Sequence, residues 1–253
     1  MEVFVINLPE DTARREATEQ QLRELGLSYE IFPAINGKCL PPEERAGCYN
    51  ETKFIRNMGW PAGGGELGCA LSHIGIYRLV RERSIPHALI LEDDVWLNPN
   101  LPQILQAIEQ KFSPGEGNLF LLGRANTVST KKYETLWSRY RIDEVRSALG
   151  TYSYVVSNAA ALALLNALYP VRNVADCWGW LRRHRIVNIL AVTPPCITLD
   201  MSYESSTLVD LSARTAKRPT LRQLTYKFYR AWWLAVDYAE ALIHRIGRGR
   251  AGK

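Results

Sequence analysis

Short apolar runs alternate with amphipathic stretches at the start of the chain. Residues 3–6 form a continuous run rich in β-branched side chains, which is typical of a strand buried on both faces of a parallel sheet. A stretch with its apolar positions near one face follows, and it predicts a helix that begins at Asp11 or Thr12 and ends at Gly26. Residues 29–32 predict a second strand. The chain therefore opens with a β-α-β unit.

The same alternation continues to about residue 205. Residues 33–65 interrupt it, since they hold four prolines and six glycines with little periodicity and are expected to form a long irregular excursion. Further helices are expected at residues 66–83 and 159–168, and further strands at residues 88–91, 118–122, 152–156 and 186–192. Strands that alternate with helices predict an α/β fold with a mostly parallel sheet flanked by helices.

The last fifty residues differ from the rest of the chain in composition and charge. Residues 206–253 begin with a polar, basic linker, and apolar residues then recur every three or four positions, which predicts an amphipathic helical tail after a domain at residues 1–205. Residues 214–253 carry a net charge of +8 and the whole chain +5, so residues 1–213 carry −3. That body is not expected to bind nucleic acid. The tail is expected either to lie on an anionic membrane surface or to pack back on the first domain.

Cysteine usage and the first residues bear on the cellular compartment. The five cysteines are odd in number and never form C-x-x-C, so their spacing indicates neither a disulfide framework nor a zinc cluster, and a reducing cytosol is expected. No run approaches 18 apolar residues, and residues 1–7 lead straight into a strand. Neither a membrane span nor a signal peptide is therefore expected.

Three consecutive carboxylates, Glu92, Asp93 and Asp94, follow the buried strand at residues 88–91. Open α/β sheets bind their ligands at the carboxyl ends of their strands. Hard oxygen ligands of this kind suit Mg²⁺ or Mn²⁺, which substrate phosphates complete. The alternative is an acidic turn, which the apolar residues on both sides of the triplet disfavour.

A glycine-rich segment at residues 63–68 leads into the helix predicted at residues 66–83. Free N–H groups at such a helix start favour an anion, although neither a Walker nor a Rossmann fingerprint is present. Glu66, Cys69 and His73 share one helix face and could form a small polar constellation. Alternatively, Cys69 packs in the core and His73 is a hydrogen-bonded helix histidine.

Two other groups could meet a substrate. Arg14 and Arg15 follow the first strand and could bind a diphosphate or uracil, or could be a solvated pair on a surface helix. Asp176 stands beside Trp178 and Trp180, an arrangement suited to a sugar acceptor, although both indoles could equally belong to the core.

Taken in order, these segments resemble glycosyltransferase family 25, the bacterial lipooligosaccharide glycosyltransferases with relatives among collagen galactosyltransferases. The resemblance covers roughly residues 3–180. It is strongest at Gly-Cys-x-x-Ser-His, which ends at His73, and at Leu-Glu-Asp-Asp, which ends at Asp94. The other matching segments are residues 3–8 with 14–16, residues 32–37, residues 154–157 and Asp176.

The resemblance implies a GT-A fold, a UDP-sugar donor, a divalent cation (Mn²⁺ or Mg²⁺) and inversion at the anomeric carbon. The roles expected in this chain are metal binding by Glu92 and Asp94, donor binding by Asn7, Leu8, Arg14, Ser72, His73 and Asp93, acceptor binding by Trp178 and Trp180, and general-base catalysis by Asp176, with Glu66 as the second choice. The triplet departs from the Asp-x-Asp common among GT-A enzymes, which leaves open which of its carboxylates touch the metal. Residues 158–165 lack basic residues that are expected in many relatives.

The expected function is transfer of a hexose, in the first place galactose from UDP-galactose, to a lipooligosaccharide or related lipid-linked acceptor. The expected location is cytoplasmic, peripheral on the inner face of the bacterial inner membrane, through residues 214–253. Two alternatives stay open. One is a transferase that uses UDP-glucose or a UDP-N-acetylhexosamine, and the other is a catalytically silent nucleotide-sugar-binding partner of a membrane complex.

Overall fold

A computed structural model describes residues 1–113 and 115–202, except for the side chains of residues 130–133. The helical tail predicted in residues 206–253, and the domain boundary expected before it, lie outside the described residues. No helix in the described part is long and apolar enough to cross a bilayer.

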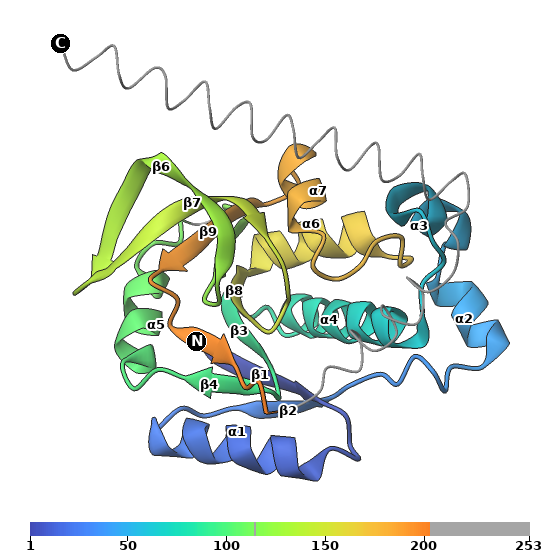
Figure 1. Cartoon of the computed structure of the whole chain (residues 1–253), viewed down its shortest axis with the longest axis horizontal. Coiled ribbons are helices and arrows are strands. Elements are labelled where there is room, and N and C mark those ends of the chain that lie inside the picture. Colours follow the sequence, from blue (N-terminus) through green and yellow to red (C-terminus); the bar gives the residue numbers. More distant parts are fainter. Residues whose placement is uncertain (114, 203–253) are drawn as a thin grey trace.

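An eight-stranded sheet runs through the molecule in the order β2-β1-β3-β8-β5-β9-β7-β6 (Figure 1). Its strands are β1 (Glu2–Asn7), β2 (Glu30–Pro33), β3 (His87–Glu92), β5 (Asn118–Leu121), β6 (Ala125–Trp137), β7 (Tyr140–Ala148), β8 (Ser153–Ser157) and β9 (Asn188–Thr193). β4 (Val95–Leu97) and β10 (Ile197–Leu199) form a separate antiparallel pair. β2, β1, β3, β5 and β9 run in one direction, and β8 lies antiparallel between β3 and β5. The expectation of a mostly parallel central sheet is confirmed.

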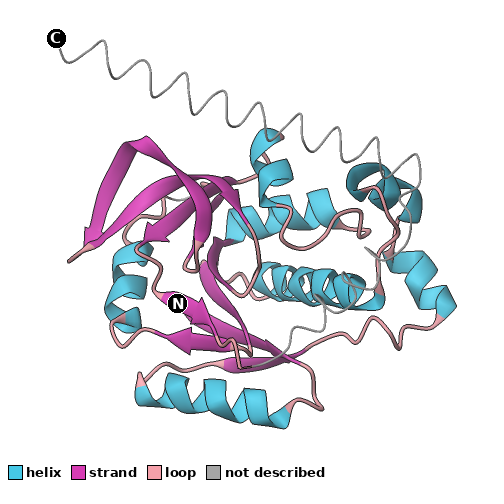
Figure 2. Cartoon of the chain, viewed as in Figure 1, coloured by secondary structure: helices cyan, strands magenta, loops and turns pink. Residues whose placement is uncertain are grey.

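Helices cover both faces of this sheet (Figure 2). They are α1 (Thr12–Glu24), α2 (Pro42–Cys48), α3 (Glu51–Met58), α4 (Gly64–Glu82), α5 (Leu101–Glu109), α6 (Asn158–Leu168) and α7 (Trp178–Arg183). α4 and α6 pack side by side in one apolar core together with α3 and α7. α1 and α5 contribute to a second core on the other face.

β1 shows why the first apolar run is continuous. Phe4 and Ile6 belong to the core beneath α4, whereas Val3 and Val5 belong to the core beneath α1 and α5. Because successive side chains of a strand point to opposite faces, a strand covered on both sides needs apolar residues at every position.

One expectation about the connections was wrong, and one hairpin was not predicted. Residues 33–65 are not one irregular excursion, because they contain α2 and α3. The sequence does carry local signals for α3, since Asn50 caps its first turn and Gly59 ends it with φ 84°. The β6–β7 hairpin was not predicted at all, because β6 is the edge strand with β7 next to it, and exposed residues such as Glu144 interrupt their apolar pattern.

Candidate active site

The acidic triplet lies where β3 ends, next to the end of β1. The parallel register pairs Ile6 with Glu92, so Asn7 comes beside Asp93. Asn7 Nδ2 donates to Asp93 Oδ2 at 2.7 Å, and Arg14 Nη1 donates to Asp93 Oδ1 at 3.4 Å. Thr18 Oγ1 donates to the carbonyl of Asp93 at 3.0 Å. Asp93 is therefore held on both carboxylate oxygens and at its backbone.

Asp94 has very different surroundings. Its Oδ1 is buried and has no hydrogen-bond partner among the described residues. Burial, followed by the charges of Glu92 and Asp93, raises the pKa of Asp94 to about 6. A buried carboxylate oxygen without a partner carries a desolvation cost that a bound cation would offset, so Asp94 is the member of the triplet best prepared to ligate a metal.

Glu92 turns toward helix α4 and the start of β8. Thr151 Oγ1 donates to Glu92 Oε1 at 2.6 Å, and His73 Nε2 lies 3.5 Å from the same oxygen. Burial acts to raise the pKa of Glu92, but the contacts with His73 and Thr151 outweigh it, and the pKa lies below its ordinary value. Glu92 is therefore ionised at neutral pH, and these contacts use only one of its two oxygens.

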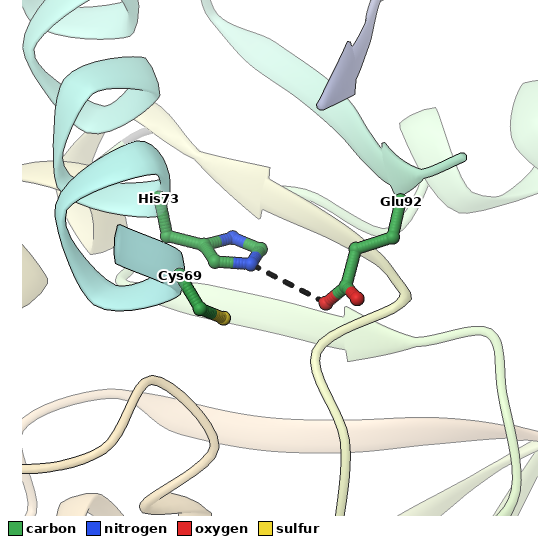
Figure 3. Close-up of side chains that lie close together, drawn as sticks. All are labelled: Cys69, His73 and Glu92. Carbon is green, nitrogen blue, oxygen red and sulfur yellow. Dashed lines mark ion pairs between the residues drawn. The ribbon is translucent and has the colours of Figure 1, made fainter. Parts of the chain in front are cut away.

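His73 is fully enclosed, with 1% of its surface exposed. Figure 3 shows its ring reaching from α4 toward the carboxylate of Glu92, with Cys69 one turn earlier on the same helix. Its Nδ1 lies 2.8 Å from the hydroxyl of Tyr154, which in turn lies 2.8 Å from the hydroxyl of Tyr77. Sequence reasoning assigned no role to these tyrosines. A tyrosine within the apolar strand predicted at residues 152–156 was a usable signal, because a buried phenol needs a hydrogen-bond partner.

Asp176 comes to the same region through the loop before β8. The N–H of Gly150 donates to Asp176 Oδ2 at 2.9 Å, and Trp178 Nε1 donates to the carbonyl of Gly150 at 2.8 Å. Gly150 adopts φ 81°, which favours glycine, and the next residue is the Thr151 that holds Glu92. Burial raises the pKa of Asp176, the Gly150 N–H offsets part of that rise, and the charge of Glu92 adds to it. A raised pKa suits a carboxylate that must take up a proton.

The two tryptophans expected at the acceptor differ in accessibility. Trp178 is 1% exposed and packs edge-on against Tyr154, so it lies in the core and presents no face to a sugar. Trp180 is half-buried and stacks on His184, with ring centroids 4.4 Å apart. Of the two indoles, Trp180 is therefore the one placed to remain an acceptor candidate.

The glycine-rich start of α4 provides its own anion. Glu66 accepts from the N–H of Gly63 at 2.9 Å and from Trp60 Nε1 at 3.1 Å, so one of the N–H groups expected to attract a substrate anion already binds this carboxylate. A Cβ at Gly68 would collide with the carbonyl oxygen of Ile35. Close backbone packing therefore accounts for this glycine.

Ser72 and Leu8, which were predicted to bind the donor, use their polar groups for hydrogen bonds within the protein. Ser72 Oγ donates to the carbonyl of Gly68 and accepts from the N–H of Ile35, each at 2.8 Å, so both of its functions are used inside the protein. Leu8 is half-buried, and its carbonyl accepts from the N–H of Asp11 at 2.9 Å in the turn before α1.

A cavity of about 220 Å³ borders Asp93, and its lining also includes Thr18, Gln21, Trp96 and Asp200. Asp94 and Asp176 are not part of that lining. The cavity therefore borders the carboxylate that is already satisfied, and we assign it no part in the chemistry.

Comparison with known proteins fits this arrangement. The sequence model described as "Glycosyltransferase family 25 (LPS biosynthesis protein)" matches residues 1–178, which contain the triplet, His73 and Asp176. The chain belongs to glycosyltransferase family 25. The family identified from the motifs is thereby confirmed.

Curated relatives come from animals as well as microbes. A "Glycosyltransferase 25 family member" of Drosophila melanogaster is 29% identical over 173 residues, which are 65% of this chain and 28% of the relative. "Procollagen galactosyltransferase 1-B" of Xenopus laevis is 28% identical over 177 residues, 66% of this chain and 28% of the relative. The chain thus spans little more than a quarter of the length of these relatives.

Among solved structures, a "glycosyltransferase involved in the glycosylation of the major capsid of PBCV-1" matches 85% of this chain and 98% of its own, with 12% identity and a TM-score of 0.42. A similarity of that degree supports no argument about the site.

Proposed function

We propose that this family 25 member is a metal-dependent, inverting hexosyltransferase that moves galactose from UDP-galactose to an oligosaccharide acceptor. The observation that carries the proposal is the difference between two carboxylates of the triplet. Both oxygens of Asp93 accept hydrogen bonds, whereas Asp94 keeps a buried oxygen without a partner in the described structure. A glycosyltransferase family supplies the reaction class, and the Xenopus relative that is named as a galactosyltransferase supports the choice of sugar.

The residues fit a divalent cation. Asp94 Oδ1 lacks a partner among the described residues, and Glu92 uses Oε1 for its contacts with Thr151 and His73, which leaves Oε2 for a ligand. Carboxylate oxygens are the ligands that Mg²⁺ and Mn²⁺ prefer. We therefore assign Glu92 and Asp94 to the cation, which when bound would neutralise the charge on a departing diphosphate.

Other residues of the site are assigned to donor binding and to activation of the acceptor hydroxyl. Arg14, whose guanidinium lies against Asp93, and Asn7 stand at the carboxyl end of β1, where the donor phosphates and uridine are expected. In the transfer step, an acceptor hydroxyl attacks the anomeric carbon from the face opposite UDP. The new C–O bond forms as the bond to the diphosphate breaks, and Asp176 takes the hydroxyl proton. Glu66 is the less favoured base, because it already caps α4.

The test is calorimetry with UDP-galactose, UDP-glucose and UDP-N-acetylglucosamine, each with Mn²⁺ and with EDTA, followed by measurement of UDP release with oligosaccharide acceptors. We expect binding that requires Mn²⁺, is tightest for UDP-galactose and leads to UDP release. A preference for another sugar would correct the donor. Binding without release would favour the silent nucleotide-sugar-binding partner, and no binding of any of the three would overturn the proposal.

We also propose that the basic tail holds the enzyme at the inner face of the bacterial inner membrane, next to a lipid-linked acceptor. The support is the +8 charge of residues 214–253. Full-length protein should sediment with phosphatidylglycerol vesicles at low salt and not with phosphatidylcholine vesicles. Equal sedimentation with both lipids, or with neither, would contradict this location.

A further inference from the structure

We infer that Cys69, His73 and Oε1 of Glu92 form a second cation site, suited to a transition-metal ion such as Zn²⁺, while Oε2 of Glu92 stays with the oxygen site at Asp94. One sulfur, one imidazole nitrogen and one carboxylate oxygen from these residues lie within 4.8 Å of one another (Figure 3). The inference concerns binding alone and does not depend on the proposed transfer reaction.

The spacing of His73 Nε2 and Glu92 Oε1 is close to what a tetrahedral ion requires. Zinc bonds of about 2.1 Å to nitrogen and oxygen place two ligand atoms roughly 3.4 Å apart. His73 Nε2 and Glu92 Oε1 are 3.5 Å apart, so they already form one edge of such a tetrahedron. Cys69 lies one helical turn before His73 on the same face of α4, and its sulfur lies within 4.8 Å of the other two ligand atoms and 3.8 Å from the hydroxyl of Thr151.

His73 is prepared to act as a ligand. It is 1% exposed, and its Nε2 makes no hydrogen bond with the described residues, although it faces the other two side chains. Its Nδ1 lies at hydrogen-bond distance from the hydroxyl of Tyr154, which is backed by Tyr77. When Nδ1 donates to Tyr154, Nε2 presents its lone pair toward Cys69 and Glu92. Metal-bound histidines usually have their second nitrogen fixed in this way.

The charges around Cys69 favour a cation. The carboxylates of Glu92, Asp176 and Glu66 all act on its thiol as nearby negative charges. On binding, the sulfur exchanges its proton for the metal, the proton leaves to the buffer, and the thiolate and the Glu92 carboxylate together balance the two positive charges.

The two sites differ in their ligands, although Glu92 contributes one carboxylate oxygen to each. Thiolate and imidazole favour zinc and its neighbours, whereas a set made of oxygen atoms favours Mg²⁺ and Mn²⁺. Cysteine spacing alone gave no hint of it, because a single cysteine supplies the sulfur and the other ligands come from a helix and a distant strand.

The experiment is titration of the full-length chain with Co²⁺, which reports on zinc-type sites, in the presence of excess Mg²⁺ that fills oxygen-ligand sites. We expect one equivalent to bind with the ultraviolet charge-transfer band of a cobalt–thiolate bond, and Zn²⁺ to displace it. Zn²⁺ should also raise the Tm. Cys69→Ser should remove the band, and His73→Gln should weaken binding at least roughly tenfold.

Two controls keep the result interpretable. Cys39→Ser changes the exposed cysteine and should leave the titration as in the wild type. Asp94→Asn should likewise leave the cobalt band unchanged, which distinguishes this site from the proposed transferase metal. Circular dichroism of metal-free Cys69→Ser checks its fold, and Cys69→Ala replaces it if it unfolds. The inference is overturned if no thiolate band appears, if the band survives in Cys69→Ser, or if it disappears in Cys39→Ser.

Discussion

Asp93 and Asp94 are neighbours in the sequence but have opposite surroundings in the structure. Asp93 receives a hydrogen bond from Asn7, a contact from Arg14 and a backbone contact from Thr18. Asp94 keeps a buried oxygen without a partner in the described part of the chain. The contacts of Asp93 therefore connect β1, α1 and β3, which is a structural role. The carboxylate of Asp94 remains available for a ligand, which is a chemical role.

The largest expected effect is on transfer, through Asp94. Asp94→Asn should lower kcat/KM for the UDP-sugar by about 10³-fold, or about 4 kcal/mol, because it removes a negatively charged ligand from the cation that neutralises the leaving group. Steady-state kinetics with Mn²⁺ measures this, with Asp11→Asn as a matched control. Asp11 lies at the start of α1, and its side chain makes no capping hydrogen bond. Retention of half the wild-type rate would remove Asp94 from the metal site.

Asp176 extends the comparison to a third carboxylate. Asp176→Asn should lower kcat by about 10²-fold while leaving donor affinity nearly unchanged, since a base acts on the acceptor in the transition state. Asparagine still offers an oxygen to the N–H of Gly150, so the loop before β8 should keep its place. The measurement is kcat alongside a calorimetric titration of the donor. An unchanged kcat would transfer the role to Glu66 or to another group.

For Asp93, the expected effect is on folding stability. Asp93→Ala should cost about 2 kcal/mol of unfolding free energy, because Asn7 Nδ2 and Arg14 lose a buried acceptor. Urea denaturation measures the loss. A double-mutant cycle with Asn7→Ala should return a coupling energy of about 1 kcal/mol, since the two side chains contact one another. Strictly additive losses would mean that the contact contributes little.

The smallest expected effect is a gain in folding stability on substitution of Asp94, opposite in sign to the loss expected for Asp93→Ala. The pKa of Asp94 is about 6 in the folded chain, against roughly 3.9 in an unfolded one. Above pH 6, the ionised Asp94 carboxylate therefore lowers the unfolding free energy of the metal-free protein by its full amount. This loss shrinks as the pH falls through 6, and it is absent below about pH 4, where the carboxyl is protonated in both states.

Asp94→Asn should accordingly stabilise the metal-free protein by about 1–2 kcal/mol at pH 8 and have almost no effect near pH 4. Thermal unfolding in EDTA at the two pH values tests this. A lower Tm for Asp94→Asn at pH 8 would show that the carboxylate is satisfied in solution, and the contrast with Asp93 would then be lost.

Local pattern was informative wherever burial repeats along the chain. The continuous apolar runs of β1 and β3, the helical spacing of α4 and the acidic residues at the end of β3 could all be assigned from sequence, and their order was enough to identify the family. The β6–β7 hairpin was not predicted from the sequence, because strands near the edge of the sheet have exposed positions that interrupt the apolar periodicity. The tail also came from sequence alone, and it stays a prediction.

What the sequence determined by itself was the set of chemical groups and the strand ends that carry them. It could not determine which groups are satisfied, because the partners are far apart along the chain: 86 residues separate Asn7 from Asp93, and 59 separate Glu92 from Thr151. The same holds for Trp178, whose burial depends on packing against Tyr154. Periodicity reports which face of an element is buried, whereas a hydrogen bond depends on where two elements meet, and tertiary structure alone fixes that.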